Sequence, residues 1–218
     1  MKKAVIFDMD GVLSDSEYIY VEKILEMLEE EGIRIEAVEI SDLFGQSMIH
    51  LCTELKRRYG LNKEASVYRD RVHELRDRHI EEKGLYPMEG AVELVRSLHK
   101  RGIPIAVASS APLKTIRGNM DHFGIGDCID GMVSGLECSQ GKPDPEIYLK
   151  AAALLHTAPS DCLVIEDSSN GVAAAKNAGM TCYAFVPPKA VPQDISRADT
   201  VLTTFTDLDP DRLLGTEA

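Results

Sequence analysis

Val5-Ile6-Phe7-Asp8-Met9-Asp10 is an apolar run that ends in two aspartates two positions apart, and Gly11 follows it. Such a run predicts a buried strand that ends where the carboxylates begin. Side chains alternate along a strand, so Asp8 and Asp10 are expected on one face beyond its end. Two close carboxylates repel unless a cation neutralises them or one is protonated, and hard oxygen ligands suit Mg²⁺. The stretch indicates a metal site, although isolated Asp-x-Asp matches are commonly solvated strand ends.

The chain beyond residue 90 alternates short apolar strands with helices. Strands are predicted over residues 105–108, 131–134, 162–165 and 181–185, and helices over residues 91–100, 115–122, 145–155 and 170–178. This alternation is typical of a parallel sheet covered on both faces. With residues 4–7 as the first strand, the predicted fold class is α/β, a doubly wound, Rossmann-like parallel sheet. The tail beyond Thr206 is expected to be a short edge helix or a frayed end.

Residues between the first two strands are predicted to form an all-helical insertion. Apolar side chains recur there at steps of three and four residues, as in Val21, Ile24, Leu25 and Leu28, and further helices are expected over residues 47–59 and 63–83. The predicted domains are a Rossmann-like core, residues 1–15 and 86–218, and a helical domain of the four-helix-bundle type, residues 16–85.

Charge and cysteine content restrict the partners and the compartment. The chain has 218 residues and a formal net charge of −12, without the basic cluster that nucleic acid or an anionic membrane requires. Five cysteines without Cys-x-x-Cys spacing suit a reducing compartment. No segment has the length and apolar character of a signal peptide or membrane span. We expect a cytoplasmic monomer with a small-molecule partner, no nucleic acid and no membrane.

Polar residues follow several predicted strands, and ligands of such sheets bind beyond the carboxyl ends of the strands. Together they would bind a divalent cation and a phosphate group: Asp8 and Asp10, Ser109 and Ser110, Glu166 and Asp167, and Lys142 in Gly-Lys-Pro-Asp-Pro before a helix. Each has a structural alternative. In a purely structural role, Ser109 and Ser110 would cap the next helix, and Lys142 would be a solvated loop residue. Glu166, Asp167 and Ser168 would form an acidic helix N-cap, a role that is compatible with metal binding.

Four motifs occur in the order found in the haloacid dehalogenase-like hydrolase superfamily, and the chain resembles that superfamily from Val5 to Phe185. They are Asp8-Met9-Asp10-Gly11, Val107-Ala108-Ser109-Ser110, Gly141-Lys142-Pro143-Asp144 and Val164-Ile165-Glu166-Asp167-Ser168. The resemblance implies that the helical insertion is a cap over the active site.

The resemblance also implies a role for each motif residue. Asp8 would attack phosphorus and form an aspartyl-phosphate, and Asp10 would protonate the leaving oxygen and then activate water. Mg²⁺ would be held by Asp8, the backbone carbonyl of Asp10 and Asp167, with Glu166 beside or behind it. Ser109 would bind a phosphoryl oxygen, and Lys142 would pair with the nucleophile Asp8 and with the transferring group, whose charge it would offset. Substrate contacts are expected from Ser110, Gly11, Gln46 and Ser47.

Several related reactions remain as alternatives within that superfamily. Asp10 disfavours a dehalogenase, and neither Lys23 nor Lys56 has the apolar context of a Schiff-base lysine. A β-phosphoglucomutase-type enzyme is the main alternative, although Gln46-Ser47-Met48 lacks the expected arginine and Tyr20 stands where a histidine is expected. We favour a Mg²⁺-dependent phosphomonoester hydrolase for a small phosphorylated metabolite, a sugar or polyol phosphate.

Two further possibilities concern binding without catalysis. A catalytically idle binding module on the same fold is a hypothesis of another class, and retention of Asp8, Asp10, Lys142 and Asp167 argues against it. His73 and His79 lie six residues apart without a third ligand, so they predict surface residues and not a zinc site.

Overall fold

The computed structural model describes residues 2–15, 17–43, 47–83, 85–186 and 193–215. They fall into two compact units. The sheet unit comprises residues 1–15, 86–189 and 194–218, and the helical unit comprises residues 16–85 with 190–193. Each unit has its own apolar cluster.

The sheet unit contains six parallel strands in the order β3-β2-β1-β4-β5-β6. They are β1 Ala4–Phe7, β2 Ile105–Ser109, β3 Gly131–Ser134, β4 Cys162–Glu166, β5 Thr181–Phe185 and β6 Thr200–Leu202. The chain moves outward from β1 to β3 and then resumes at β4 on the other side of β1. Because loops leave this switch point in opposite directions, the carboxyl ends of β1 and β4 border a natural ligand site. The predicted doubly wound fold is confirmed.

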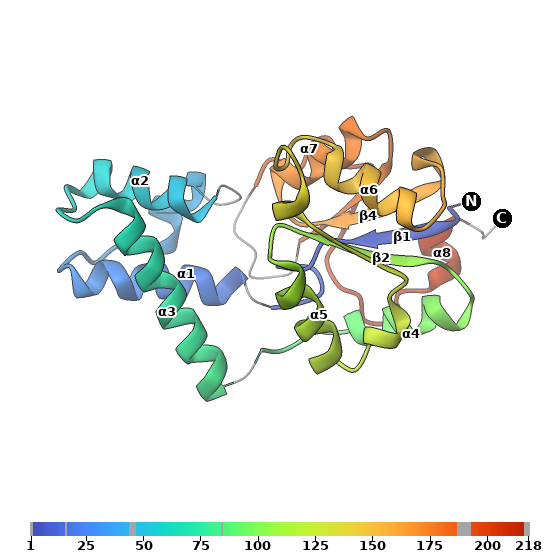
Figure 1. Cartoon of the computed structure of the whole chain (residues 1–218), viewed down its shortest axis with the longest axis horizontal. Coiled ribbons are helices and arrows are strands. Elements are labelled where there is room, and N and C mark those ends of the chain that lie inside the picture. Colours follow the sequence, from blue (N-terminus) through green and yellow to red (C-terminus); the bar gives the residue numbers. More distant parts are fainter. Residues whose placement is uncertain (1, 16, 44–46, 84, 187–192, 216–218) are drawn as a thin grey trace. The chain divides into compact units, whose positions relative to one another are not determined.

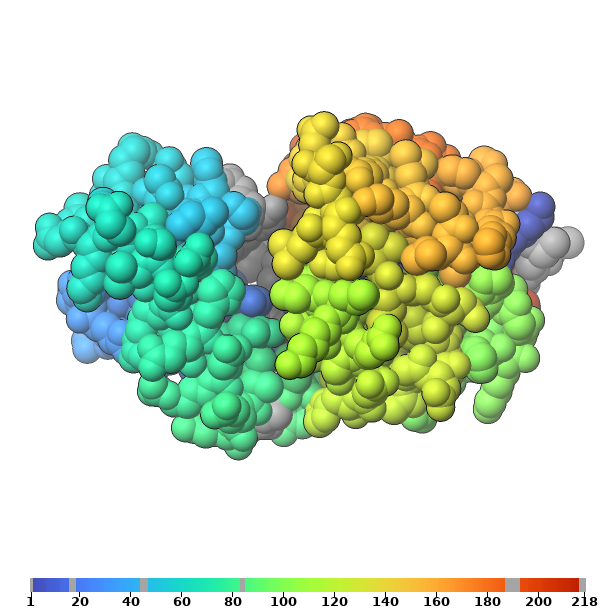
Figure 2. Space-filling model, in the orientation of Figure 1, coloured from blue at the N-terminus to red at the C-terminus, as the bar shows by residue number. Residues whose placement is uncertain are grey.

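Helices cover both faces of this sheet (Figure 1). Helices α6 (Glu146–Leu154) and α7 (Ser169–Asn177) lie on one face, and α4 (Ala91–Lys100), α5 (Leu113–His122) and α8 (Pro210–Leu214) lie on the other. Alternate strand residues therefore meet different helices, and Ala4 and Ile6 pack into the cluster with α6 and α7. Green-to-orange residues form the surface of the sheet unit on the face shown in Figure 2, and all four residues of β1 are completely buried.

Two elements of the sheet unit differ from or refine the sequence expectation. Strand β6 was not predicted, because its three residues are partly to fully exposed and form no apolar run beyond Val201 and Leu202. Its hydrogen bonding to β5 places it in the sheet. The tail is the expected short helix, α8, which begins after the N-cap Asp209.

The helical unit contains, within its described residues, three α-helices and one 3-10 helix. They are α1 (Glu17–Glu30), η1 (Ala37–Leu43), α2 (Met48–Tyr59) and α3 (Ala65–Lys83). Their apolar stripes meet in one cluster that includes Ile24, Leu28, Leu55, Val72 and Leu75. Helix α2 ends at Tyr59, and the C-cap Gly60 takes a left-handed φ of 67°, which lets the following Leu61 N–H donate to the Lys56 carbonyl at 3.2 Å.

The surface position predicted for His79 is wrong, because this residue of α3 is only 6% exposed, and its Nδ1 lies 3.9 Å from a carboxylate oxygen of Glu22 in α1. Lys23 is also buried, and burial alone would lower its pKa. Hydrogen bonds to Glu22 and Glu26 outweigh burial and raise that pKa. A lysine held this way is not the neutral amine that a Schiff base requires.

The chain leaves and re-enters the sheet unit along two paired segments. The Asp15 N–H donates to the Tyr86 carbonyl at 3.1 Å, and the Met88 N–H donates to the Leu13 carbonyl at 2.9 Å. These bonds anchor the loop after β1, in which Gly11 takes a left-handed φ of 80°. None of the helices in the described ranges combines the length and apolar character needed to cross a membrane.

Candidate active site

Asp8 directly follows β1 and extends its pairing with β4. Its N–H donates to the Ile165 carbonyl at 2.9 Å, so its backbone is fixed at the switch point of the sheet. The residue is 6% exposed, and its Oδ1 accepts a hydrogen bond from Lys142 Nζ at 2.5 Å. Residues 134 positions apart in sequence thus form one buried ion pair.

Lys142 lies in the loop before α6, and its ammonium bridges two carboxylates. Nζ lies 2.5 Å from Asp8 Oδ1 and 2.6 Å from Glu166 Oε1, with the Ala108 carbonyl at 3.5 Å. Burial alone would lower the pKa of Lys142, but the charges of Asp8 and Glu166 raise it well above its ordinary value. The side chain is therefore a fixed positive charge at the strand ends.

The two carboxylates respond differently to the same lysine. Burial raises the pKa of Asp8, Lys142 opposes this, and Glu166 adds to it, so that the pKa reaches about 8. Burial would also raise the pKa of Glu166, but the charge and hydrogen bond of Lys142, together with Ser168, hold it below its ordinary value. Glu166 is thus the main counter-ion of Lys142, and the positive charge of Lys142 does not fully compensate the burial of Asp8.

Glu166 ends β4 and uses both carboxylate oxygens inside the protein. Oε1 accepts from Lys142 and from the Tyr148 hydroxyl at 3.0 Å. Oε2 accepts from the N–H groups of Asp167 and Ser168, both at 2.7 Å, and from the Ser168 hydroxyl at 3.0 Å. Ser168 is also the N-cap of α7, so the helix start, the strand end and Lys142 are held by one carboxylate.

Gly171, in the first turn of α7, lies directly against that carboxylate. A Cβ at this position would lie 1.6 Å from Glu166 Oε1 and 1.9 Å from its carboxyl carbon. Only glycine therefore permits the observed Glu166 conformation, although α7 would otherwise gain from a better helix former.

We expect Gly171→Ala to lower the free energy of unfolding by about 1–3 kcal/mol, because Glu166 must leave its hydrogen bonds. Gly118→Ala is the matched control, since Gly118 lies inside α5 with no atom within 4 Å of a Cβ, and it should stabilise by about 0.5–1 kcal/mol. Urea denaturation measures both. Equal stabilisation by the two substitutions would contradict the close packing at Gly171.

Three carboxylates at the strand ends form a candidate metal site. One oxygen each of Asp8, Glu166 and Asp167 lies within 4.8 Å of the others. When all three are ionised, they exceed the single ammonium of Lys142 by two negative charges, which a divalent cation would balance. Hard oxygen donors with this charge fit Mg²⁺.

The remaining predicted residues of the sheet unit occupy the same end of the sheet or the loop after β1. Ser109 ends β2, beside β1, and is buried; its Oγ accepts the Ala111 N–H at 3.1 Å, the local turn bond expected of a structural serine. This hydroxyl can still donate to a ligand. Ser110 is exposed. Asp10 is half-buried and forms a bridge with Ser14, and Gly11 N–H donates to the Ser14 carbonyl at 2.9 Å.

The substrate contacts predicted for Gln46 and Ser47, in the helical unit, stay predictions. Ser47 is the exposed N-cap of α2, and Gln46 lies outside the described residues. Conversely, Tyr148 and Gly171 contact Glu166 but were not predicted. A tyrosine and a glycine inside apolar helices give no signal in sequence that separates them from ordinary packing residues.

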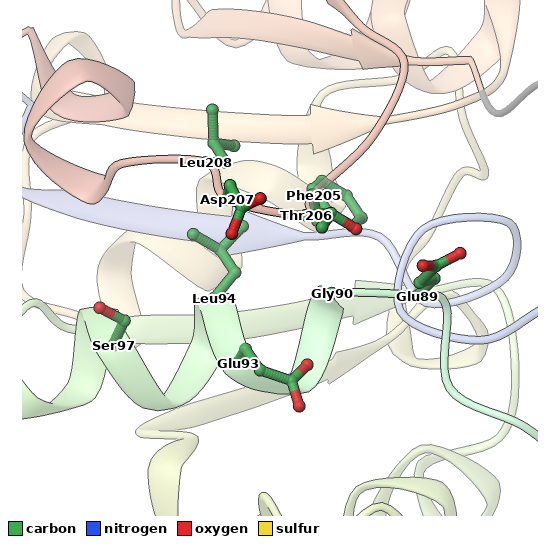
Figure 3. Close-up of a pocket in the computed structure, with 9 residues that line it drawn as sticks. All are labelled: Glu89, Gly90, Glu93, Leu94, Ser97, Phe205, Thr206, Asp207 and Leu208. Atoms are coloured by element: carbon green, nitrogen blue, oxygen red, sulfur yellow. The ribbon is translucent and has the colours of Figure 1, made fainter.

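A hollow of about 540 Å³ lies elsewhere on the sheet unit, between α4 and the segment Phe205–Leu208 (Figure 3). The charged residues among its nine lining residues are the carboxylates Glu89, Glu93 and Asp207. Such a lining repels phosphate, so the hollow is not an alternative phosphate site.

Sequence comparison relates the chain to a family and to named enzymes. Residues 5–185 match the haloacid dehalogenase-like hydrolases. Hexitol phosphatase B of Escherichia coli (strain K12) is 31% identical over 220 residues, 97% of this chain and 96% of that protein. The chain spans 55% of the bifunctional riboflavin kinase/FMN phosphatase of Arabidopsis thaliana, at 28% identity over 95% of the chain, and 17% of the SUPPRESSOR OF QUENCHING 1 protein of that plant.

Solved structures share the fold. A HAD family hydrolase from Deinococcus radiodurans R1, crystallised with bound phosphate and sodium, is 28% identical with a TM-score of 0.80, covering 98% of this chain and 96% of that one. The β-phosphoglucomutase of Clostridium difficile is 24% identical with a TM-score of 0.77, covering 99% and 96%, and at that identity shows the fold alone. Because the family match extends over residues 5–185, most of the chain, the chain belongs to the haloacid dehalogenase-like hydrolase family.

Proposed function

We propose that the protein is a Mg²⁺-dependent phosphatase that hydrolyses the monoester of a small phosphorylated metabolite, a sugar or polyol phosphate. The observation that carries this proposal is the buried ammonium of Lys142 held between Asp8 and Glu166 at the carboxyl ends of the strands. An enzyme that transfers a phosphoryl group needs a nucleophile, a fixed cation and a metal site within one small volume. The similarity to hexitol phosphatase B supports the substrate class.

In the proposed reaction, a carboxylate oxygen of Asp8 forms a bond to phosphorus as the bond to the ester oxygen breaks. Asp10 protonates the departing alcohol and then takes a proton from the water that attacks the aspartyl-phosphate. Phosphate leaves and Asp8 is restored. Lys142 offsets the charge on the phosphoryl oxygens, and Ser109 donates a hydrogen bond to one of them.

Asp8, Asp167 and the backbone carbonyl of Asp10 would hold the metal, with Glu166 behind them because its oxygens already accept five hydrogen bonds. A bound Mg²⁺ would add positive charge beside the transferring group. The helical unit would act as a cap that admits substrate and then excludes water.

The test is phosphate release from a panel of sugar, polyol and short-acid phosphates. We expect release from at least one class with Mg²⁺, a fall of more than ~100-fold in EDTA, and recovery when Mg²⁺ is restored, because the carboxylate cluster otherwise repels phosphate. β-Glucose 1-phosphate is followed separately for glucose 6-phosphate. Conversion without net phosphate release would identify a mutase instead, and inactivity on every substrate would contradict the proposal.

A further inference from the structure

Tyr148 is a fully buried residue of α6 that contacts both members of an ion pair in the site. Its hydroxyl donates to Glu166 Oε1 at 3.0 Å, since an ionised carboxylate only accepts. Lys142 Nζ lies 5.0 Å from the centroid of its ring, within the range of a cation–π contact. The remainder of the side chain packs in the apolar cluster between α6 and the sheet.

We infer that Tyr148 is a positioning residue, which acts through Glu166 to keep the Lys142 ammonium shared between Glu166 and Asp8. An effect of Tyr148 on the rate of phosphate release rests on the proposed function. Its effect on the position of Lys142 does not.

The physical reason is competition between two carboxylates for one ammonium. Nζ lies at almost equal distances from Asp8 Oδ1 and Glu166 Oε1, 2.5 and 2.6 Å. The Tyr148 hydroxyl shares Oε1 with Lys142, which reduces the negative charge that Glu166 presents to the ammonium. Without that hydroxyl, Glu166 would attract Lys142 more strongly, and the ammonium would move away from Asp8.

Such a shift would weaken the reaction and leave the fold intact. The proposed nucleophile is Asp8, so positive charge withdrawn from it is withdrawn from the transferring phosphoryl group. Tyr148→Phe removes the hydroxyl and keeps the ring, its apolar packing and its contact with Lys142.

Tyr68→Phe is the matched control. Tyr68 is also almost fully buried, and its hydroxyl accepts the Lys63 N–H at 3.0 Å within the helical unit. Both substitutions delete one buried, hydrogen-bonded hydroxyl, so a similar fall in Tm is expected from each. A general packing effect would act equally in both variants.

The experiment is ¹⁵N NMR of the lysine ammonium groups in metal-free protein, with Lys142→Arg to assign Lys142, alongside steady-state kinetics. In Tyr148→Phe we expect the Lys142 resonance to shift, a longer Nζ–Oδ1 distance to Asp8 in its crystal structure, and kcat to fall about tenfold with KM within about twofold. Tyr68→Phe should leave the resonance and kcat unchanged.

An unchanged Lys142 resonance and an unchanged Nζ–Oδ1 distance in Tyr148→Phe would overturn the inference and leave Tyr148 a packing residue. A fall in kcat matched by Tyr68→Phe would do the same. If the wild-type protein released no phosphate from any substrate, the proposed function would fail, and the spectra and the crystal structure would still decide the role of Tyr148.

Discussion

Asp8→Asn should reduce phosphate release by on the order of 10⁴-fold or more, because an amide oxygen is not a nucleophile that can form and then release a phosphoryl ester. The substitution keeps the shape of the side chain, and its amide oxygen can still accept from Lys142. Asparagine also removes the repulsion between Asp8 and Glu166. We therefore expect a Tm within a few degrees of the wild type.

Asp161→Asn is the matched control for this prediction. Asp161 precedes β4 at the opposite end of the sheet and pairs with Lys3 at 2.9 Å. The Asp161→Asn variant thus loses an ion-paired aspartate, but the strand ends that carry the site are unchanged. Its phosphate release should equal that of the wild type. Retention of more than about one hundredth of the activity by Asp8→Asn would exclude covalent catalysis by Asp8.

The sequence predicted the centre of the fold well because local and long-range signals agree there. Strand β1 is apolar at every position, and its completely buried residues lie between β2 and β4, as the uninterrupted run requires. Strand β6 was missed because it exists through its pairing with β5 and carries little apolar signal of its own.

The candidate site was predictable only as a set of residue types. The strand ends and the order of the motifs indicated Asp8, Lys142 and Asp167 as site residues. No sequence periodicity predicts that the Lys142 ammonium bridges the carboxylates of Asp8 and Glu166. Tyr148 lies in an apolar helix, where its spacing matches that of a core residue, and the hydroxyl that distinguishes it from phenylalanine contacts a residue 18 positions away.

Lys142→Met should produce the largest loss of stability. Methionine retains most of the apolar stem but leaves the buried Asp8 and Glu166 carboxylates without their shared cation. Removal of one partner from a buried ion pair typically costs about 3–5 kcal/mol, because the remaining charge is neither solvated nor paired. Activity should also fall by at least ~10³-fold, since the fixed positive charge beside the phosphoryl group is lost.

The matched control is Lys176→Met, which removes a lysine from an ion pair with Asp199 at the surface, 2.6 Å in the wild type. Solvent compensates the exposed pair, so this variant should lose no more than about 1 kcal/mol. Urea denaturation of both variants and the wild type at pH 7.5 gives the comparison. Equal losses would contradict the view that Lys142 neutralises a buried cluster.

The pH dependence of the Lys142→Met variant gives a second, independent check. Without the ammonium, the pKa values of Asp8 and Glu166 in the folded variant should lie above those of the unfolded chain, because burial and mutual repulsion then act unopposed. A folded state that binds more protons than the unfolded state becomes less stable as pH rises. In the wild type, the raised pKa of Lys142 and the lowered pKa of Glu166 keep this pair charged from pH 5.5 to pH 7.5. The pKa of Asp8 is already raised to about 8 in the wild type, so the difference between the two proteins over this range comes mainly from Glu166. The stability deficit of the variant should therefore be smaller at pH 5.5 than at pH 7.5, and a deficit that grew on acidification would show that the lost interaction is not electrostatic.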